Sequence, residues 1–348
     1  MYKTLRLIAV LALVAVWAIV IRMWTTRQTL PPSAPAVTSG QSGTRLVMGT
    51  FANVTAVARD QDTITRAVTA AHDELDAVDD MMSDYKPDSE LTLVNREAFD
   101  RPVPVSEPLF EVLQASLEYS IISEGAFDVT IGPVVQLWRD MQKQNSRPTD
   151  QQLAEARQKV GYRHLILDAE NRTVRFARPG MKLDLGAIAK GYAIDRAIDA
   201  MKAAGAAGGL VDVGGDIRCF GLSPKLTNTW RIGLDDPDGD GDILLVLNLT
   251  DIAVATSGDY RRFVVIDDQR FSHIINPSTT ASARDLTSVT IIAPTAMQAD
   301  ALATVVSVMG HEKGLALIES VDNTEAILIP AADPALFIKT KGADDYIR

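Results

Sequence analysis

The sequence predicts an α+β fold, in which one domain of mixed sheets and helices follows an N-terminal apolar segment. Strand-like and helix-like segments alternate irregularly along residues 45–348, and no repeat of fixed period is evident. Hairpins mixed with crossing helices are typical of α+β proteins rather than of doubly wound parallel sheets. Because no second linker divides these residues, we expect one domain over residues 45–340.

The N-terminal segment predicts attachment to a membrane or export across it. Lys3 and Arg6 precede an uncharged apolar run, Leu7–Ile21, and Arg22 follows it. This run is shorter than the roughly 20 residues that span a bilayer. It therefore suits either an uncleaved anchor extended through Trp24 or a signal peptide. The positive charges before the run predict that the domain lies on the periplasmic side of the cytoplasmic membrane.

We assign residues 1–25 to this anchor or signal peptide. Residues 26–44, rich in Pro, Ser, Thr and Gly, are assigned to a flexible tether. The only cysteine in the sequence is Cys219, so no intramolecular disulfide can form, and lipidation after the apolar run is excluded. A net charge of −11 argues against the clustered positive surface that nucleic-acid binding requires.

The periodicity of apolar residues predicts the elements of the domain in order. Alternation predicts a strand over Val47–Arg59, and a 3.6-residue period predicts a helix over Asp62–Met82. Further helices are expected over Pro108–Ser123, Ala189–Ala204 and Ala296–Met309. A hairpin is expected to join His164–Asp168 to Thr173–Phe176. Other strands are expected at Leu210–Val213, Trp230–Leu234, Ile243–Leu249, Ala253–Thr256, Phe263–Asp267 and Ser288–Ile292.

Asp300 and Thr304 lie four residues apart on the last predicted helix. This spacing places a carboxylate and a hydroxyl on one helix face. The pair forms half of a site for a hard cation such as Mg²⁺, which accepts phosphates to complete its shell. The alternative is that Asp300 only favours the first turn of the helix and that Thr304 packs.

The segment Leu183–Asp195 leads from an extended stretch through a tight glycine turn into a helix. Small residues there let the backbone approach a ligand, and a helix N-terminus favours anions. The segment has neither the GxxxxGK[ST] nor the GxGxxG spacing, so neither a P-loop nor a Rossmann site is supported. Asp184 as an ordinary turn residue and Lys190 as an exposed cation remain alternatives.

Three other polar segments can contribute to a site. The paired glycines in Asp212–Ile217 predict a sharp bend or a close backbone approach. His273 is the one histidine in a candidate polar loop, although an isolated histidine is more often structural. Asp236–Gly241 resembles the start of an EF-hand loop, but Leu247 stands where the acidic twelfth residue is required, which favours a hairpin turn.

The order of these segments resembles that of the ApbE family, the Mg²⁺-dependent FAD:protein FMN transferases. The resemblance covers roughly residues 45–330. It rests on eight blocks in family order: Met48-Gly-Thr, Ser83-Asp-Tyr-Lys-Pro-Asp-Ser-Glu-Leu, Gly125-Ala-Phe-Asp-Val-Thr-Ile-Gly-Pro, Leu183-Asp-Leu-Gly-Ala-Ile-Ala-Lys-Gly, Val213-Gly-Gly-Asp, Ser257-Gly-Asp-Tyr, His273-Ile-Ile-Asn-Pro and Ala299-Asp-Ala-Leu-Ala-Thr.

The resemblance implies a single domain related to the T-fold and a set of site residues. It implies Mg²⁺ ligands at Asp300, Thr304 and, through its backbone carbonyl, Ala187. It implies that His273 and Asp300 serve catalysis, with His273 as the general base. The residues that it implies for FAD binding are Met48, Tyr85, Ala126, Phe127, Asp128, Asp184, Lys190, His273 and Ile274.

The resemblance also implies a partner and a product. A Ser or Thr hydroxyl in an acceptor protein, expected to be a subunit of a membrane redox complex, receives FMN and AMP is released. Two alternatives remain: a Mg²⁺-dependent FAD pyrophosphatase and a non-catalytic FAD-binding protein. The sequence departs from the family in one block, where Asn276 and Thr280 replace the usual Asp and Gly of Asp-Pro-x-Thr-Gly. We expect this change to affect substrate handling.

Overall fold

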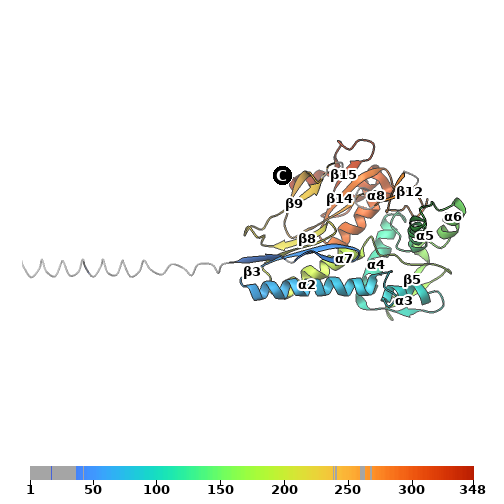
Figure 1. Ribbon diagram of the computed structural model, residues 1–348, viewed down its shortest axis with the longest axis horizontal. Coiled ribbons are helices and arrows are strands. Elements are labelled where there is room, and N and C mark those ends of the chain that lie inside the picture. The colour runs from blue at the N-terminus through green and yellow to red at the C-terminus, as the bar shows by residue number, and fades with distance from the viewer. Residues whose placement is uncertain are drawn as a thin grey trace, which may run out of the picture.

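The computed structural model describes Trp17 and residues 37–41, 43–237, 239, 241–258, 263–266 and 269–348. The predicted anchor or signal peptide therefore lies, apart from Trp17, outside the described residues. Asp267, predicted as a strand end, and Asp259 and Tyr260 of the Ser257-Gly-Asp-Tyr block also lie outside them. Figure 1 shows the described domain as a central sheet with helices packed around it.

The main sheet has nine strands within the described chain, and every pairing in it is antiparallel. Its order is β1-β3-β7-β8-β11-β14-β15-β16, with β2 also paired to β3. The strands are β1 (Thr38–Gln41), β2 (Arg45–Val47), β3 (Thr50–Ala58), β7 (Gly208–Val213), β8 (Asp216–Gly221), β11 (Ala253–Gly258), β14 (Leu286–Ala293), β15 (Glu325–Pro330) and β16 (Ile338–Lys339). This antiparallel sheet and its helices confirm the predicted α+β class.

The predicted strand Val47–Arg59 is wrong at its start, because the chain reverses there. Met48 has a φ of 52° and Gly49 a φ of 69°, so a two-residue turn joins β2 to β3. Turns with two positive φ values match the twist of hairpin strands. A methionine in the first of these positions gives no turn signal in the sequence.

The predicted tether, residues 26–44, contains a strand of the sheet. Thr38–Gln41 pair with Thr55–Ala58 of β3, although these four residues show no apolar alternation. Gly40 also lies close to α2, where an added Cβ would stand 2.5 Å from Ile64 Cγ2. The folded domain therefore includes Thr38 and begins earlier than the predicted residue 45.

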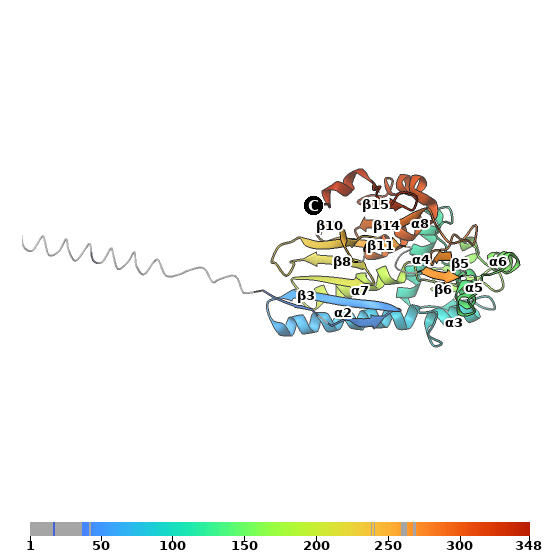
Figure 2. The ribbon, with the colours of Figure 1, turned by 45° about the horizontal axis from the view of Figure 1, so that its top comes forward.

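Helices α2 (Gln61–Met82), α7 (Ala189–Ala203) and α8 (Ala296–Ile318) pack on one another and on one face of the sheet (Figures 1 and 2). Together with the inner face of the sheet they enclose the main apolar core. All three helices were predicted. Helix α8 is interrupted just after the predicted end at Met309, where Gly310, with a φ of 78°, kinks the chain, and helical turns resume beyond it to Ile318.

A hairpin of β9 (Trp230–Asp235) and β10 (Ile243–Leu249) contributes to a second apolar cluster, on the other face of the sheet. This confirms the predicted hairpin around Asp236–Gly241, of which Asp238 and Asp240 lie outside the described residues. The 3-10 turn η2 (Lys341–Asp345) packs beside β15.

The remaining elements gather at one end of the domain (Figures 1 and 2). They are α3 (Glu90–Glu97), α4 (Glu107–Ile122), α5 (Gly132–Lys143), α6 (Asp150–Arg157), the turn η1 (Tyr162–His164), a sheet of β4 (Val103–Pro104), β6 (Thr173–Phe176) and β5 (Leu165–Asp168), and the hairpin of β12 (Phe263–Ile266) and β13 (Gln269–Ser272). Helix α4 and the β5–β6 hairpin were predicted, whereas α3, α5 and α6 were not.

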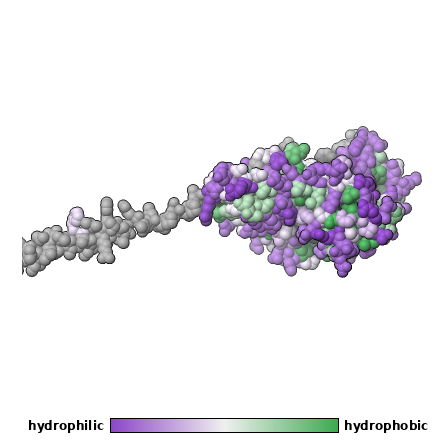
Figure 3. Space-filling model, turned by 90° about the horizontal axis from the view of Figure 1, so that it is seen from below, coloured by the Kyte–Doolittle hydropathy of each residue, from purple (hydrophilic) through white to green (hydrophobic). Residues whose placement is uncertain are grey.

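Among the described residues, one helix is long and apolar enough to cross a membrane, and it is α8. Half of its apolar window is buried inside the domain, where it packs against β11 and β14. Helix α8 is therefore a core helix. The face in Figure 3 is mostly hydrophilic, and its hydrophobic residues form small separate patches.

Candidate active site

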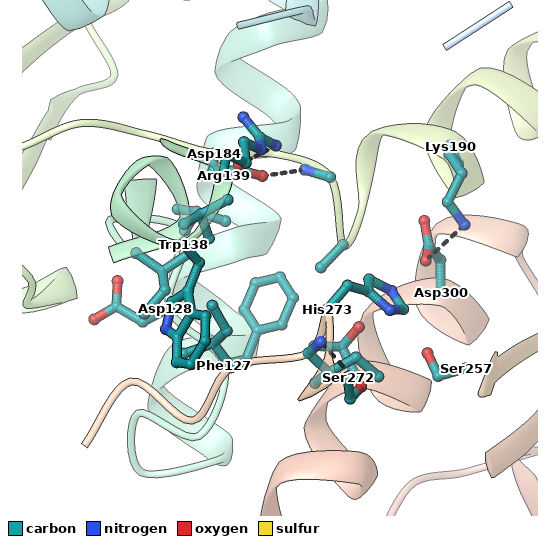
Figure 4. Close-up of a pocket in the computed structure, with 18 of the residues that line it drawn as sticks. Phe127, Asp128, Trp138, Arg139, Asp184, Lys190, Ser257, Ser272, His273 and Asp300 are labelled. Carbon is teal, nitrogen blue, oxygen red and sulfur yellow. Dashed lines mark hydrogen bonds and ion pairs between the residues drawn. The ribbon is translucent and has the colours of Figure 1, made fainter. Parts of the chain in front are cut away.

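A cavity of about 490 Å³ lies where the main sheet and α8 meet the end of the domain that carries α5. Figure 4 shows residues from α5, α7, α8 and β11 and from the loop after β13 converging on it. Every predicted site residue except Met48 lines this cavity: Tyr85, Ala126, Phe127, Asp128, Asp184, Ala187, Lys190, His273, Ile274, Asp300 and Thr304. Residues more than 200 positions apart in the sequence are thus brought together, while their chemical roles stay predictions.

Met48 lies in the β2–β3 turn and packs against the main core instead of lining the cavity. The backbone N–H of Gly214, which does line the cavity, donates to the carbonyl of Phe51 at 2.9 Å. The turn that holds Met48 is therefore next to the cavity wall.

Helices α7 and α8 start against each other at the cavity, and each supplies an acceptor for the first turn of the other. The carboxylate of Asp300 in α8 accepts the Gly191 N–H of α7 at 3.1 Å. In return, Asp195 of α7 accepts the N–H groups of Ala296 at 2.8 Å and Met297 at 2.9 Å. These bonds satisfy donors that a helix start leaves without intrahelical partners.

Gly191 is required for this approach. A Cβ on Gly191 would stand 2.2 Å from the backbone oxygen of Ala296, which cannot move without shifting α8. The glycine that follows Lys190 in the predicted turn-to-helix segment is therefore the point at which the starts of α7 and α8 touch.

A lysine and two carboxylates form a buried charged group at the same place. The ammonium of Lys190 pairs with Asp216, the first residue of β8, and lies 3.4 Å from Asp300 Oδ1. Asp216 is 2% exposed and Asp300 is 4% exposed. The alternative that Lys190 is an exposed cation is therefore wrong. Asp300 does not only favour the first turn of its helix, because it also contacts Lys190.

The oxygen donors beside this group fit a hard cation. Asp300 and Thr304 lie one helical turn apart on α8 and both line the cavity, as does Ala187. Within the described residues no cluster of three or more His, Cys, Asp or Glu side chains could hold a metal. A carboxylate, a hydroxyl and a carbonyl are hard ligands of the kind Mg²⁺ binds, and they leave positions open for phosphate oxygens and water.

Arg139 of α5 organises the opposite wall of the cavity. Its guanidinium pairs with Asp84 and with Asp184, the latter at 3.0 Å, and lies 4.5 Å from the ring centroid of Tyr85. Burial raises the pKa of the Asp184 carboxyl, and the charge of Arg139 opposes that shift. Arg139 was not predicted, because helix α5 was missed. The proline at its start and the apolar spacing of Val134, Val135 and Trp138 are the available signals.

Asp128 already has several donors from its own chain. It accepts the N–H of Thr130 at 2.8 Å, the hydroxyl of Thr130 at 2.6 Å and the N–H of Tyr162 at 2.8 Å. Burial raises the pKa of its carboxyl, and these hydrogen bonds oppose the shift. Asp128 therefore fixes the loop that places Phe127 in the cavity, with limited capacity left for a ligand.

The model of the ApbE family matches residues 48–328 of this chain. The chain belongs to the ApbE family.

Curated relatives within ApbE agree with this assignment. The FAD:protein FMN transferase of Haemophilus influenzae is 34% identical over 296 residues, which cover 82% of this chain and 85% of the relative. The enzyme of the same name from Vibrio cholerae is 36% identical over 250 residues, 71% of this chain and 74% of its own.

Solved ApbE structures share the fold. The ApbE protein of Thermotoga maritima aligns with a TM-score of 0.81 and 30% identity, covering 89% of this chain and 99% of its own. The flavin transferase ApbE of Vibrio cholerae aligns with a TM-score of 0.78 and 31% identity, covering 88% and 99%.

The loop in which this ApbE chain departs from the predicted family block has a strained backbone. Thr280, which stands where the resemblance implies a Gly, is buried and adopts a φ of 60°. A β-branched residue is rare in this left-handed region, and such strain costs about 1–3 kcal/mol. Asn276 accepts the N–H of Ser278 at 2.9 Å, and Trp138 Nε1 donates to the Thr280 carbonyl at 3.3 Å. The asparagine amide therefore keeps the turn without the charge of the usual Asp.

His273 opens this loop and is exposed at the cavity. In Figure 4 its ring is directed toward the side of the cavity that holds Asp300 and Lys190. The predicted base and the predicted metal ligand thus face a common space.

Proposed function

We propose that this protein transfers the FMN half of FAD to a Ser or Thr hydroxyl of an acceptor protein and releases AMP. The observation that carries the proposal is that one cavity is lined by the oxygen donors Asp300 and Thr304 together with Lys190, an aromatic wall and His273. The names of the curated relatives support the same reaction.

The aromatic groups and the charged groups divide the cavity between the rings of FAD and its pyrophosphate. Phe127 is buried in the wall, and Tyr85 is held at the rim by Arg139. Both rings offer flat surfaces for an isoalloxazine or adenine ring. Lys190 lies at the other side, where its ammonium favours the pyrophosphate.

The metal ligands proposed are Asp300, Thr304 and the backbone carbonyl of Ala187. A bound Mg²⁺ there would neutralise pyrophosphate charge and favour the departure of AMP. Asp300 is held for this role by the Gly191 N–H, which fixes one carboxylate oxygen.

In the proposed reaction the acceptor oxygen attacks the phosphorus on the FMN side of the pyrophosphate. The new bond joins that oxygen to phosphorus, and the bond from phosphorus to the bridging oxygen breaks. AMP leaves with the bridging oxygen, and the acceptor carries FMN as a phosphoester. His273 takes the proton of the attacking hydroxyl, a role that suits an imidazole near neutral pH.

The N-terminal segment supports a proposal for where the enzyme is located in the cell. We propose that residues 1–25 hold the enzyme at the cytoplasmic membrane with its domain on the periplasmic side. Acceptor proteins there would include exported subunits of membrane redox complexes.

Incubation with FAD, MgCl₂ and a candidate acceptor tests the reaction. We expect flavin fluorescence on the acceptor band in a denaturing gel, one AMP for each flavin transferred, and loss of both with EDTA. Replacing the acceptor Thr by Val should abolish labelling. Free FMN with an unlabelled acceptor would instead establish the pyrophosphatase, and FAD bound without AMP release would establish a binding protein.

The substitution Asp300→Asn distinguishes the role of Asp300 in metal binding from its role in holding the fold. The amide oxygen can still accept the Gly191 N–H, while the carboxylate charge is lost. We expect a loss of transfer greater than that of His273→Ala, since a general base contributes about 10²–10⁴-fold. Asp199→Asn, at an exposed position of α7, is the matched control. Near-normal, Mg²⁺-dependent transfer by Asp300→Asn would refute the assigned ligand.

A further inference from the structure

Asp216 is a buried carboxylate beside the proposed metal site to which the proposed reaction gives no role. It is the first residue of β8 and follows the turn formed by Gly214 and Gly215, whose φ values are 65° and 92°. The pairing of Val213 with Asp216 makes this a two-residue turn. The turn places the Asp216 side chain against the start of α7, and not out in solvent.

The carboxylate of Asp216 is fixed from two sides. One oxygen pairs with the Lys190 ammonium, and the other accepts the Thr256 N–H of β11 at 3.3 Å. Gly214 cannot easily be replaced, because an added Cβ would stand 2.6 Å from Thr50 Oγ1 and the φ is positive. The sheet therefore determines where Asp216, and with it the lysine, stands.

The charges of Lys190, Asp216 and Asp300 determine how strongly the proposed metal site attracts a cation. Lys190 contacts both Asp216 and Asp300, so one ammonium is shared by two carboxylates and the three groups sum to a charge of −1. If a neutral side chain replaced Asp216, Asp300 would be the sole carboxylate partner of the ammonium, and the total charge of the three groups would be zero. A divalent cation would then have to displace a fully paired lysine.

We propose that Asp216 is a positioning residue that draws the Lys190 ammonium away from Asp300 and so keeps Asp300 available to a divalent cation. The inference rests on the proposed function only in taking Asp300 as a metal ligand. With the cation bound, Asp216 keeps Lys190 near the site, where its charge can meet the pyrophosphate. Residues that orient metal ligands commonly change metal affinity by about 10–100-fold when mutated.

The test measures cation binding directly, in the full-length protein without FAD. Mn²⁺ replaces Mg²⁺ as the probe, and the EPR signal of free Mn²⁺ gives its dissociation constant. We expect Asp216→Asn to bind Mn²⁺ about tenfold more weakly than the wild type, or worse. Asp300→Asn should abolish binding at this site, and Asp199→Asn should leave it unchanged.

A second background shows whether Asp216 acts through the lysine. Lys190→Met removes the competing ammonium, so we expect Mn²⁺ to bind more tightly than in the wild type. In that background Asp216→Asn should weaken binding by a smaller factor. A carboxylate that only stabilised the fold would weaken binding equally in both backgrounds, and this result would overturn the proposal.

The outcomes also separate this inference from the proposed function. Wild-type protein that binds no Mn²⁺, or Asp300→Asn protein that binds it normally, refutes the metal assignment and the inference with it. If binding depends on Asp300, but Asp216→Asn binds Mn²⁺ as the wild type does, only the inference fails. Circular dichroism and thermal melting of each variant identify unfolded protein, and Asp216→Glu then serves as the variant that retains the charge.

Discussion

Replacing Gly191 by Ala tests the contact between the starts of α7 and α8. Helix propensity alone predicts a gain of about 0.8–1.0 kcal/mol, because alanine is favoured over glycine inside a helix. The structure predicts the opposite sign. The new Cβ would stand 2.2 Å from the Ala296 oxygen and 2.6 Å from the Met297 Cα, both in backbone.

The expected magnitude follows from three contributions. Overpacking of a tight contact costs about 1–3 kcal/mol. Alanine keeps its N–H, but the displacement of α8 breaks the hydrogen bond to the charged Asp300, which costs about 1.5–3 kcal/mol more. After the gain in propensity, the free energy of unfolding should fall by about 1.5–5 kcal/mol.

Urea unfolding followed by circular dichroism measures this change. The same preparation, titrated with Mn²⁺, should show weaker cation binding, because Asp300 moves with α8. Gly43→Ala is the matched control, since a Cβ at Gly43 meets nothing within 4 Å. A Gly191→Ala protein that is more stable than the wild type and binds Mn²⁺ normally would refute the proposed helix contact.

Two further changes test the capping of α8 and the buried histidine of α2. Asp195→Ala removes the acceptor for the N–H groups of Ala296 and Met297, so we expect urea unfolding to show a loss of about 1–2 kcal/mol from the lost cap. The loss of the ion pair with Arg218 adds to it. Burial lowers the pKa of His72 below its ordinary 6.5. The stability contributed by the neutral ring is therefore present above pH 6.5 and lost as the pH falls below it. Thermal melts from pH 7.5 to 5.5 should show this fall in melting temperature for the wild type, and a smaller fall for His72→Leu.

Each of these two predictions has its own control. Asp195→Asn keeps one acceptor oxygen but loses the ion pair with Arg218, so its loss should be smaller than that of Asp195→Ala, and equal losses would contradict the capping argument. For the histidine, the exposed His311 provides the comparison. If His311→Leu flattened the pH dependence as much as His72→Leu, burial would not be its cause.

The sequence predicted the parts of the fold and site that depend on local spacing. The helix Asp62–Met82 was recognised by its period, and it occupies Gln61–Met82. Asp300 and Thr304 were placed on one helix face because four residues make about one helical turn. Their role as metal ligands was implied only by the resemblance to the ApbE family, and it stays a prediction.

The parts that were missed depend on contacts between distant segments. Strand β1 is polar and gains its structure from pairing with β3. Lys190 was implied as a residue that binds FAD, but its pairing with Asp216 was not predicted, because only the β7–β8 turn brings the two together. Arg139 was missed together with helix α5, and its pairing with Asp84 and Asp184 joins three segments that are distant in the sequence.

The mutual capping of α7 and α8 has a consequence for how the site opens. Asp195 belongs to α7 and accepts N–H groups of α8, and Asp300 belongs to α8 and accepts an N–H group of α7. If either helix frays at its start, backbone N–H groups of both helices therefore lose their acceptors. Amide protons of the two first turns should therefore exchange with solvent in one cooperative event. The end of the molecule that carries the cavity would then be ordered or disordered as a whole, and a partly assembled form of the proposed metal site would be scarcely populated.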